Sequence, residues 1–273
     1  MCCPETKTVA IAGLGAIGLP VARALDERRI PGLVLSAIAV RDGEKARRAL
    51  AGFKHQPEIV DIADLGAHAD CVIECAPAAV FRAIALSAID RGRIFMPLSV
   101  GQLLTHDDLV ARARENSARI VVPSGALLGL DAVRAVNEGT VASVKIVTRK
   151  PPAGLKGAPW LVQNAISVDA LNEPLRVFSG TAREAIKGFP ANVNVAVALS
   201  LAGIGPDKTI VEIWADPTVS RNMHTIEVLS DSSDFTMTIA GRPTKETPAT
   251  GMITPLSVIA ALRRLTAPLV IGT

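Results

Sequence analysis

The segment TVAIAGLGAIGLPVARAL, residues 8–25, constrains the fold more than any other part of the chain. It predicts a buried strand, a glycine turn and an amphipathic helix, with glycines at G-x-G-x-x-G spacing. In such a unit the first glycine makes the turn, the second admits a pyrophosphate, and the third lets helix and strand pack closely. The helix N-terminus offers N–H groups and a positive dipole end to the phosphates. The predicted cofactor-binding residues of this turn are Gly13, Gly15, Ala16, Ile17 and Gly18.

Composition favours the same architecture. The chain has 273 residues, which is enough for two domains, and 49% of them are hydrophobic. Tyr is absent and aromatic residues make up only 3%, so Ala, Val, Ile and Leu must build the core. Parallel sheets covered by helices have strands that are aliphatic runs of this kind. We therefore expect an ordered α/β protein.

The charge and hydropathy patterns argue against nucleic-acid and membrane partners. The net charge is +3, Lys and Arg are scattered, and few aromatic side chains are present to stack on bases. No apolar run reaches the roughly 18 residues that a membrane-spanning helix requires. The first ten residues lack the basic and apolar regions of a signal peptide. The sequence thus predicts a cytoplasmic protein.

The cysteines predict neither a metal site nor a disulfide. Cys71 and Cys75 are four residues apart in a predicted strand, without C-x-x-C spacing or a neighbouring histidine of zinc-site type. We expect buried thiols in a reducing compartment, and no bound metal.

Two domains follow from the order of the predicted elements. Strands and helices alternate through residues 1–125, which predicts a doubly wound parallel sheet of the Rossmann type; Thr105 is expected to cap one of its helices. From Thr140 onward, apolar–polar alternation predicts a mainly antiparallel sheet in an α+β domain. We place a dinucleotide-binding domain at 1–125, completed by a C-terminal helix at about 252–273. A substrate and dimerisation domain then occupies 126–251, and its exposed sheet is the predicted homodimer surface.

The end of the second predicted strand bears on the choice between NAD and NADP. In NAD-preferring folds a carboxylate at this place hydrogen-bonds the ribose 2′-hydroxyl. Here Val40 or Arg41 takes the position, and Asp42 follows. Arg41 can stack on adenine or accept a 2′-phosphate, Asp42 can reach a ribose if the turn is short, and both can be solvated turn residues. The preference stays open.

His224 is the histidine best suited to chemistry. It follows ADPTVSRNM and precedes the apolar segment TIEVLS, so a turn delivers it to a strand edge of the second domain, where it can face a cleft between domains. Imidazole titrates near neutrality and can relay protons or assist an incoming water. The other three histidines lie in polar settings of the first domain. A hydrogen-bonded structural role for His224 is the alternative.

Three further segments place polar groups beside apolar scaffolds. Ser124-Gly125-Ala126 follows the last strand of the first domain, where backbone amides would meet a nicotinamide. Asn192 and Asn194 begin an aliphatic helix and are either ligands or helix caps. Arg149 and Lys150 end a strand and either bind a substrate carboxylate or are solvated.

Taken together, these segments resemble the L-aspartate dehydrogenase family. The resemblance spans most of the chain, and its later segments are more specific than the glycine motif. The matching segments are GLGAIG (13–18), SGALLGLDA (124–132), TRKPP (148–152), FPANVNVAVALSLAG (189–203) and ADPTVSRNMH (215–224). One segment departs: the family often has an Asn-Pro-Lys-Thr-Ser-like segment before the last helix, where this chain has TPATG (247–251). That difference leaves the choice of substrate open.

The resemblance implies NAD(P)-dependent oxidation of L-aspartate to iminosuccinate, which hydrolyses to oxaloacetate and ammonia or feeds NAD biosynthesis. It also implies that His224 is the active-site residue and that Ala126 and Asn192 contact the cofactor, with Asn194 as the other candidate. In the predicted mechanism the substrate amine is neutral while its α-hydrogen leaves as hydride. The candidates for binding the two carboxylates of this dicarboxylic amino acid are Asn194, Arg149 and Lys150.

Two other functions remain compatible with the residues. One is a dehydrogenase or reductase for another small amino or dicarboxylic acid, which the altered 247–251 segment allows. The other is a non-catalytic NAD(P)-binding sensor, which would bind the cofactor without turnover. The intact ADPTVSRNMH segment argues against a sensor, because a sensor needs no imidazole on the substrate side.

Overall fold

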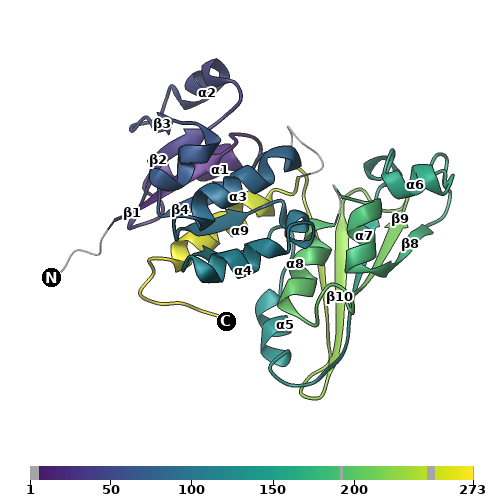
Figure 1. Ribbon diagram of the computed structural model, residues 1–273. Helices are drawn as coiled ribbons and strands as arrows, with labels where there is room; N and C mark the ends of the chain where they lie inside the picture. Colours follow the sequence, from purple (N-terminus) through teal and green to yellow (C-terminus); the bar gives the residue numbers. More distant parts are fainter. Residues whose placement is uncertain (1–5, 191–192, 245–249, 273) are drawn as a thin grey trace. The chain divides into compact units, whose positions relative to one another are not determined.

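The computed structural model describes residues 6–190, 193–244 and 250–272. The chain divides into two compact units, both drawn in Figure 1. Unit 1 consists of residues 1–125 and 254–270, and unit 2 of residues 126–253 and 271–273. Within the described ranges, no helix combines the length and the apolar character needed to cross a membrane.

Unit 1 is built on a six-stranded parallel sheet with the order β3-β2-β1-β4-β5-β6. The chain order reverses between β1 and β4, which is the switch point of a doubly wound fold. The central strands are aliphatic and buried, as the low aromatic content requires. The strands are β1 (Lys7–Ala12), β2 (Leu33–Ala39), β3 (Glu58–Ile59), β4 (Cys71–Glu74), β5 (Ile94–Pro97) and β6 (Arg119–Ile120).

Helices from both ends of the chain complete unit 1. The helix nearest the C-terminus, α9 (Ile253–Arg264), buries Val258 and Leu262 in the same core as β1 and α1. Complete burial of a Val or Leu side chain contributes about 1.5–3 kcal/mol, so α9 is a structural part of the unit. The others are α1 (Gly18–Asp26), α2 (Gly43–Leu50), α3 (Phe81–Ile89) and α4 (Asp108–Glu115), with the 3₁₀ helices η1 (Ile62–Ala67), η2 (Ala78–Val80) and η3 (Val100–Leu104).

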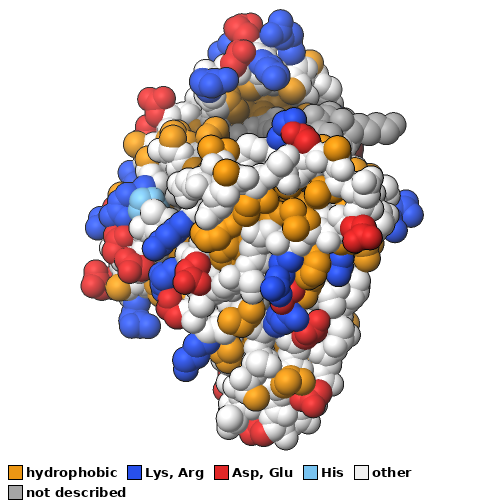
Figure 2. All heavy atoms as spheres, turned by 90° about the vertical axis from the view of Figure 1, so that its right-hand side faces the viewer, with side chains coloured by type: hydrophobic (Ala, Val, Ile, Leu, Met, Phe, Trp, Pro, Cys, Tyr) orange, Lys and Arg blue, Asp and Glu red, His pale blue; other side chains and the backbone are white. Residues whose placement is uncertain are grey.

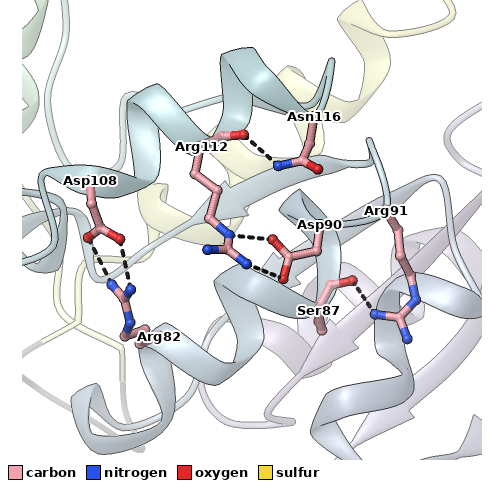
Figure 3. A network of polar contacts seen from close by, with 7 residues as sticks. All are labelled: Arg82, Ser87, Asp90, Arg91, Asp108, Arg112 and Asn116. Carbon is pink, nitrogen blue, oxygen red and sulfur yellow. Dashed lines mark hydrogen bonds and ion pairs between the residues drawn. The ribbon is translucent and has the colours of Figure 1, made fainter.

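The expected cap of α4 is wrong. Thr105 ends η3, where its backbone N–H donates to the carbonyl of Gln102, and α4 begins later, at Asp108. The preceding 3₁₀ helix thus uses the residue that the sequence pattern assigned to capping. Further along the same surface, charged side chains join α3 to α4 (Figure 3). Arg82 binds Asp108 through two hydrogen bonds of 2.8 and 2.7 Å, and Arg112 binds Asp90 in the same two-pronged manner.

Unit 2 is built on a five-stranded sheet with the order β11-β10-β7-β9-β8. All neighbours are antiparallel except β7 and β9. The fold class is therefore confirmed: a doubly wound parallel sheet and a second α+β domain on a mainly antiparallel sheet. The strands are β7 (Val141–Lys150), β8 (Leu175–Thr181), β9 (Ile210–Ala215), β10 (Met223–Ser230) and β11 (Phe235–Ala240).

The two faces of this sheet differ. The covered face, defined by Val144, Ile146, Thr148 and Lys150 of β7 and by His224, Ile226 and Val228 of β10, is buried, and its apolar members share a core with residues of α5, α7 and α8. The charged face, on the other side, is defined by Lys145, Arg149, Arg176, Glu212, Trp214 and Glu227. The helices of unit 2 are α5 (Leu130–Val136), α6 (Pro159–Gln163), α7 (Ala182–Gly188) and α8 (Asn194–Ala202), with the 3₁₀ helix η4 (Pro152–Gly154).

Candidate functional site

The three glycines after β1 each have a separate geometric reason. Gly13 has φ of +96°, and a Cβ at that position would lie 2.5 Å from the carbonyl oxygen of Cys75. A Cβ on Gly18 would overlap the carbonyl oxygen of Gly13. Gly15 differs, because a Cβ there would meet nothing within 4 Å. Gly13 and Gly18 are thus required by the protein's own packing, whereas the open space at Gly15 suits close approach of an outside group.

The start of α1 is suited to an anion. Its N-cap is Ile17, which provides no side-chain cap, and its first turn carries no acidic residue. The N-terminal N–H groups and the helix dipole therefore meet no competing carboxylate of this turn. Ala16 and Ile17 lie between Gly15 and the first residue of the helix. The residues present fit the pyrophosphate of a dinucleotide.

The end of β2 carries the residues that bear on NAD or NADP. Arg41 is exposed and follows the strand by two positions. Asp42 is the N-cap of α2, and its carboxylate accepts a 3.0 Å hydrogen bond from the backbone N–H of Lys45. One oxygen of Asp42 is thus used to cap a helix, which is a common role for Asp.

Glu74 is a buried acidic residue that the sequence analysis did not single out. It ends β4 and is 0% exposed. Its carboxylate accepts hydrogen bonds from the backbone N–H groups of Ala76, Leu98 and Ser99 and from the Ser99 hydroxyl, at 2.9–3.2 Å. Burial raises the pKa of Glu74 above its usual value, and the four hydrogen bonds offset part of that rise. The side chain ties together the segments that follow β4 and β5.

An acidic residue at the carboxyl end of an aliphatic strand, as in CVIEC, is the signal that would have revealed Glu74. In doubly wound sheets ligands bind at the carboxyl ends of the strands. Glu74 therefore fixes two of the segments at the edge where a dinucleotide is expected.

The Ser124-Gly125-Ala126 segment is held by the last helix. The backbone N–H of Gly125 donates a 3.1 Å hydrogen bond to the hydroxyl of Ser257 in α9. Gly125 has φ of +64°, the left-handed region that favours glycine. The division between the two units falls between Gly125 and Ala126, so the predicted cofactor contact Ala126 is the first residue of unit 2.

His224 lies on the covered face of unit 2, near the start of β10. It is 3% exposed, and its Nδ1 lies 3.0 Å from the hydroxyl oxygen of Thr148, its cross-strand partner on β7. Burial, together with the nearby charge of Lys150, lowers the pKa of His224 to about 4. The imidazole is therefore neutral at pH 7, and the hydrogen bond to Thr148 orients its ring. A neutral, oriented imidazole can donate a hydrogen bond to a substrate or water, or accept one from it.

Lys150 and Arg149 are adjacent in sequence but lie on opposite sides of the sheet. Lys150 is on the covered face with His224 and is 6% exposed; burial lowers its pKa to about 8. Arg149 is on the charged face, where it donates a 3.0 Å hydrogen bond to Asp216 and lies over the ring of Trp214. Because side chains alternate along β7, only Lys150 of the two predicted substrate-binding cations lies on the same face as His224.

Only one of the two predicted asparagines, Asn194, belongs to the part of the chain that the structure describes. Asn194 is the first residue of α8, and the N-cap before it is Val193, which provides no side-chain cap. Asn192 lies outside the described residues, as do residues 247–249 of the divergent TPATG segment. The two described residues of that segment, Thr250 and Gly251, form backbone contacts with Thr244 and Pro243.

Comparison with known proteins agrees with this geometry. Residues 131–265 match the model of the aspartate dehydrogenase C-terminal domain, and residues 13–123 match that of the homoserine dehydrogenase NAD-binding domain. The L-aspartate dehydrogenase of Bradyrhizobium diazoefficiens is 58% identical over 97% of this chain and 94% of its own length. L-aspartate dehydrogenase 3 of Bordetella bronchiseptica is 51% identical over 98% of both chains. The chain belongs to the L-aspartate dehydrogenase family.

A solved aspartate dehydrogenase has a similar fold. The crystal structure of the enzyme from Thermotoga maritima matches 97% of this chain and 99% of its own, with a TM-score of 0.72 and 24% sequence identity. As in other dehydrogenases, a nicotinamide dinucleotide is the cofactor, and the match to an NAD-binding domain covers the glycine turn of unit 1. The open space at Gly15 and the uncapped start of α1 fit that group.

Proposed function

We propose that this protein oxidises L-aspartate to iminosuccinate, with release of oxaloacetate and ammonia after hydrolysis, and that it accepts either NAD or NADP. The single observation that carries the proposal is His224: a buried, neutral imidazole, oriented by Thr148, in a chain that is 58% identical to an L-aspartate dehydrogenase. The exposed Arg41 next to a capping Asp42 supports acceptance of NADP as well as NAD.

The two units supply different parts of the reaction. Gly15, Ala16 and Ile17 of unit 1 would hold the pyrophosphate, with Ala126 and Asn192 as the proposed contacts to the rest of the cofactor. When bound, the nicotinamide accepts the hydride of the substrate Cα. The chain's own task is to orient the amino acid, exclude water during hydride transfer and manage protons at the substrate nitrogen and Cα.

On the substrate side we assign His224, Lys150 and Asn194. His224, in its neutral form, would hydrogen-bond the water that attacks the iminium carbon. Lys150 shares the covered face with His224, and Asn194 begins α8, which packs on that face through Ala196 and Leu199. The geometry does not favour Arg149, because its guanidinium binds Asp216 on the charged face.

The test is formation of reduced cofactor from L-aspartate with NAD or NADP, in the wild type and in His224→Ala. Loss of the imidazole should lower kcat by about 10²- to 10⁴-fold, the usual contribution of a positioned acid or base. Binding of reduced cofactor, followed by its fluorescence, should be unchanged. His55→Ala, which removes an imidazole whose side chain is 62% exposed in unit 1, is the matched control. Equal turnover in His224→Ala and wild type would contradict the assignment, and cofactor binding without turnover of any amino acid would indicate a sensor.

We further propose a homodimer formed through the charged face of unit 2. Lys145 bridges Glu212 and Glu227, and Arg176 also pairs with Glu212, so the face carries both signs of charge, as a self-complementary surface requires. On the same side of the sheet Ile210 and Leu229 are 38% and 51% exposed. Figure 2 shows hydrophobic side chains lying beside charged ones of both signs on one side of the molecule. Light scattering after size exclusion would show a single-chain mass if this is wrong.

A further inference from the structure

We propose that Lys150 is the base that takes the proton from the substrate's α-ammonium group before hydride transfer. This inference rests on the proposed oxidation of L-aspartate and gives Lys150 a chemical task within it. An α-ammonium group is protonated at neutral pH, and it has no lone pair to assist loss of the neighbouring hydride. A group that removes this proton is therefore needed on the substrate side.

The register of the sheet places Lys150 beside His224. His224 is opposite Thr148 in the β7–β10 pair, and Lys150 is two residues further along β7, on the same face. Diagonal neighbours of this kind are within reach of long side chains. The charge of Lys150 acts on His224 strongly enough to contribute to the low pKa of the imidazole. The covered face thus holds an amine and an imidazole together, both almost completely buried.

The neighbours of Lys150 on the described strands make its ammonium form less favourable than it is in water. On its own strand the neighbour on the covered face is Thr148, and on β10 it is the neutral His224. On β9 Lys150 is paired with Ala215, and the carboxylate of the next residue, Asp216, binds Arg149 and Thr218. Val193, Ala196 and Leu199, at and beyond the start of α8, contribute apolar side chains to the core of this face. In such surroundings burial disfavours the ammonium form, and the pKa of Lys150 is lowered to about 8.

His224 is a poorer base for this step. Its pKa of about 4 means that it holds a proton weakly, whereas an amine with a pKa of about 8 accepts one readily and is still partly unprotonated near neutral pH. A base is most effective when its pKa lies near the working pH. The two side chains thus divide the work: Lys150 acts on the nitrogen before oxidation, and His224 acts with water after it.

The step balances without any further reactant. The lone pair of the Lys150 Nζ forms a bond to one ammonium proton of the substrate, and that N–H bond breaks with its electron pair left on the substrate nitrogen. This pair then forms the C=N bond as the Cα–H bond breaks and its two electrons leave as hydride. The substrate is oxidised, and the nicotinamide of NAD(P)⁺ is reduced. Lys150 returns its proton to solvent before the next turnover.

The competing role for Lys150 is a permanent cation that binds a substrate carboxylate. The two roles differ in what arginine can replace. A guanidinium is always charged and binds carboxylates well, but it cannot accept a proton. Lys150→Arg therefore keeps a carboxylate anchor and removes a base, and Lys150→Met removes both at similar volume.

The experiment compares the wild type with Lys150→Met and Lys150→Arg across pH 6–10 in the direction of aspartate oxidation. If Lys150 is the base, kcat falls by about 10²- to 10⁴-fold in both variants. The rise of kcat with pH near 8 in the wild type should also disappear. Lys156→Met, which removes an exposed lysine of unit 2 that lies outside both faces of the sheet, is the control and should keep the wild-type profile. Melting temperature and binding of reduced cofactor confirm that each variant is folded.

A second measurement does not depend on turnover. The lysine side-chain signal that is missing from the NMR spectrum of Lys150→Met should titrate near pH 8 in the wild type, because burial lowers its pKa to about that value. A signal that titrates above 10 would overturn the proposal.

The outcomes separate this inference from the proposed function. Near wild-type kcat in Lys150→Arg would make Lys150 a carboxylate anchor, and an unchanged pH profile in Lys150→Met would remove it from proton transfer; either result overturns the inference while the oxidation of aspartate stands. A wild type that forms no reduced cofactor with L-aspartate, but does so with another amino acid, overturns the proposed substrate and with it this step for aspartate.

Discussion

The two units surround their buried ionisable groups in different ways. In unit 1, Glu74 is surrounded by four hydrogen-bond donors, three of them backbone N–H groups. In unit 2, Lys150 and His224 are buried together on one face, and burial moves the pKa of each toward the neutral form. The first arrangement fixes backbone segments, whereas the second brings an amine and an imidazole to one face of the sheet. This difference fits the proposed division of roles, in which unit 1 holds the cofactor and unit 2 acts on the substrate.

The largest expected effect tests whether unit 1 works through its backbone. Gly18→Ala would force a Cβ against the carbonyl of Gly13, so we expect loss of stability of about 1–3 kcal/mol or more, as in other overpacked sites. In Gly15→Ala the new methyl group meets open space, so the melting temperature should be unchanged. Cofactor binding should weaken, because the methyl group would occupy the proposed place of the pyrophosphate. Thermal unfolding and fluorescence titration with reduced cofactor measure the two effects. Tight cofactor binding by Gly15→Ala would break the comparison.

The next largest effect is expected for Glu74→Gln, which tests whether the hydrogen bonds to this buried carboxylate stabilise unit 1. The glutamine side chain would place its NH₂ group against N–H and O–H groups that now donate to the carboxylate, so at least one buried donor would lose its acceptor. We expect about 1–3 kcal/mol of destabilisation, the cost of an unsatisfied buried polar group. The pKa of Glu74 is raised on folding, so the folded state holds this proton more tightly, and ionising the side chain costs stability as pH rises from 4.5 through the raised pKa. That loss should be present in the wild type and absent from Glu74→Gln. Urea unfolding at several pH values gives both numbers, and parallel pH curves for the two proteins would contradict the assignment.

A smaller effect is expected at Thr148, which touches the imidazole but not the substrate in this scheme. Thr148→Val keeps the shape and removes the 3.0 Å contact with Nδ1, so the ring loses its orientation. We expect kcat to fall about tenfold, which corresponds to one hydrogen bond of roughly 1.4 kcal/mol. KM for the cofactor should be unchanged, and Thr148→Ser should restore kcat. Failure of serine to restore it would indicate a packing role instead.

The smallest effect is expected at Arg149. Its guanidinium binds Asp216 and lies over Trp214 on the charged face, so Arg149→Met should change KM for L-aspartate by less than about threefold, a change of under 1 kcal/mol. Steady-state kinetics with varied aspartate measures this. A large rise in KM would return Arg149 to the substrate side and weaken the contrast between the two faces of the sheet.

The fold of unit 1 was largely predictable because its signals are local. Glycine spacing and aliphatic runs depend directly on backbone geometry, and β1 and α1 lie where the segment 8–25 predicts a strand and a helix. In unit 2, strands β7, β10 and β11 have the apolar–polar alternation that predicts a sheet from Thr140 onward. Strand β8 was not predicted, because it lacks this alternation. A register shift between Arg176 and Phe178 places both Val177 and Phe178 in the core. Helix α7 was missed although Thr181 and Glu184 form a capping box with the expected spacing.

The candidate site was less predictable, since it depends on which face a side chain takes. Arg149 and Lys150 look equivalent in sequence, and the pleat of β7 separates them only once its partners are known. The partnership of His224 with Thr148 likewise joins residues 76 positions apart. Glu74 was not predicted, because its hydrogen-bond donors are mainly backbone N–H groups of the segments after β4 and β5, and no sequence pattern shows that these groups meet.

The dependence of unit 1 on α9 has a consequence for the order of events during synthesis. The ribosome makes residues 1–125 before residues 126–253, but Val258 and Leu262, which belong to the core of unit 1, emerge only after both segments. In sequence, most of unit 2 comes between the two segments of unit 1, so unit 2 can fold before the last helix of unit 1 has been made. Of the two units, the one whose synthesis begins earlier is therefore completed later, and a polypeptide that ends before α9 would expose the aliphatic surface that α9 covers to chaperones and proteases.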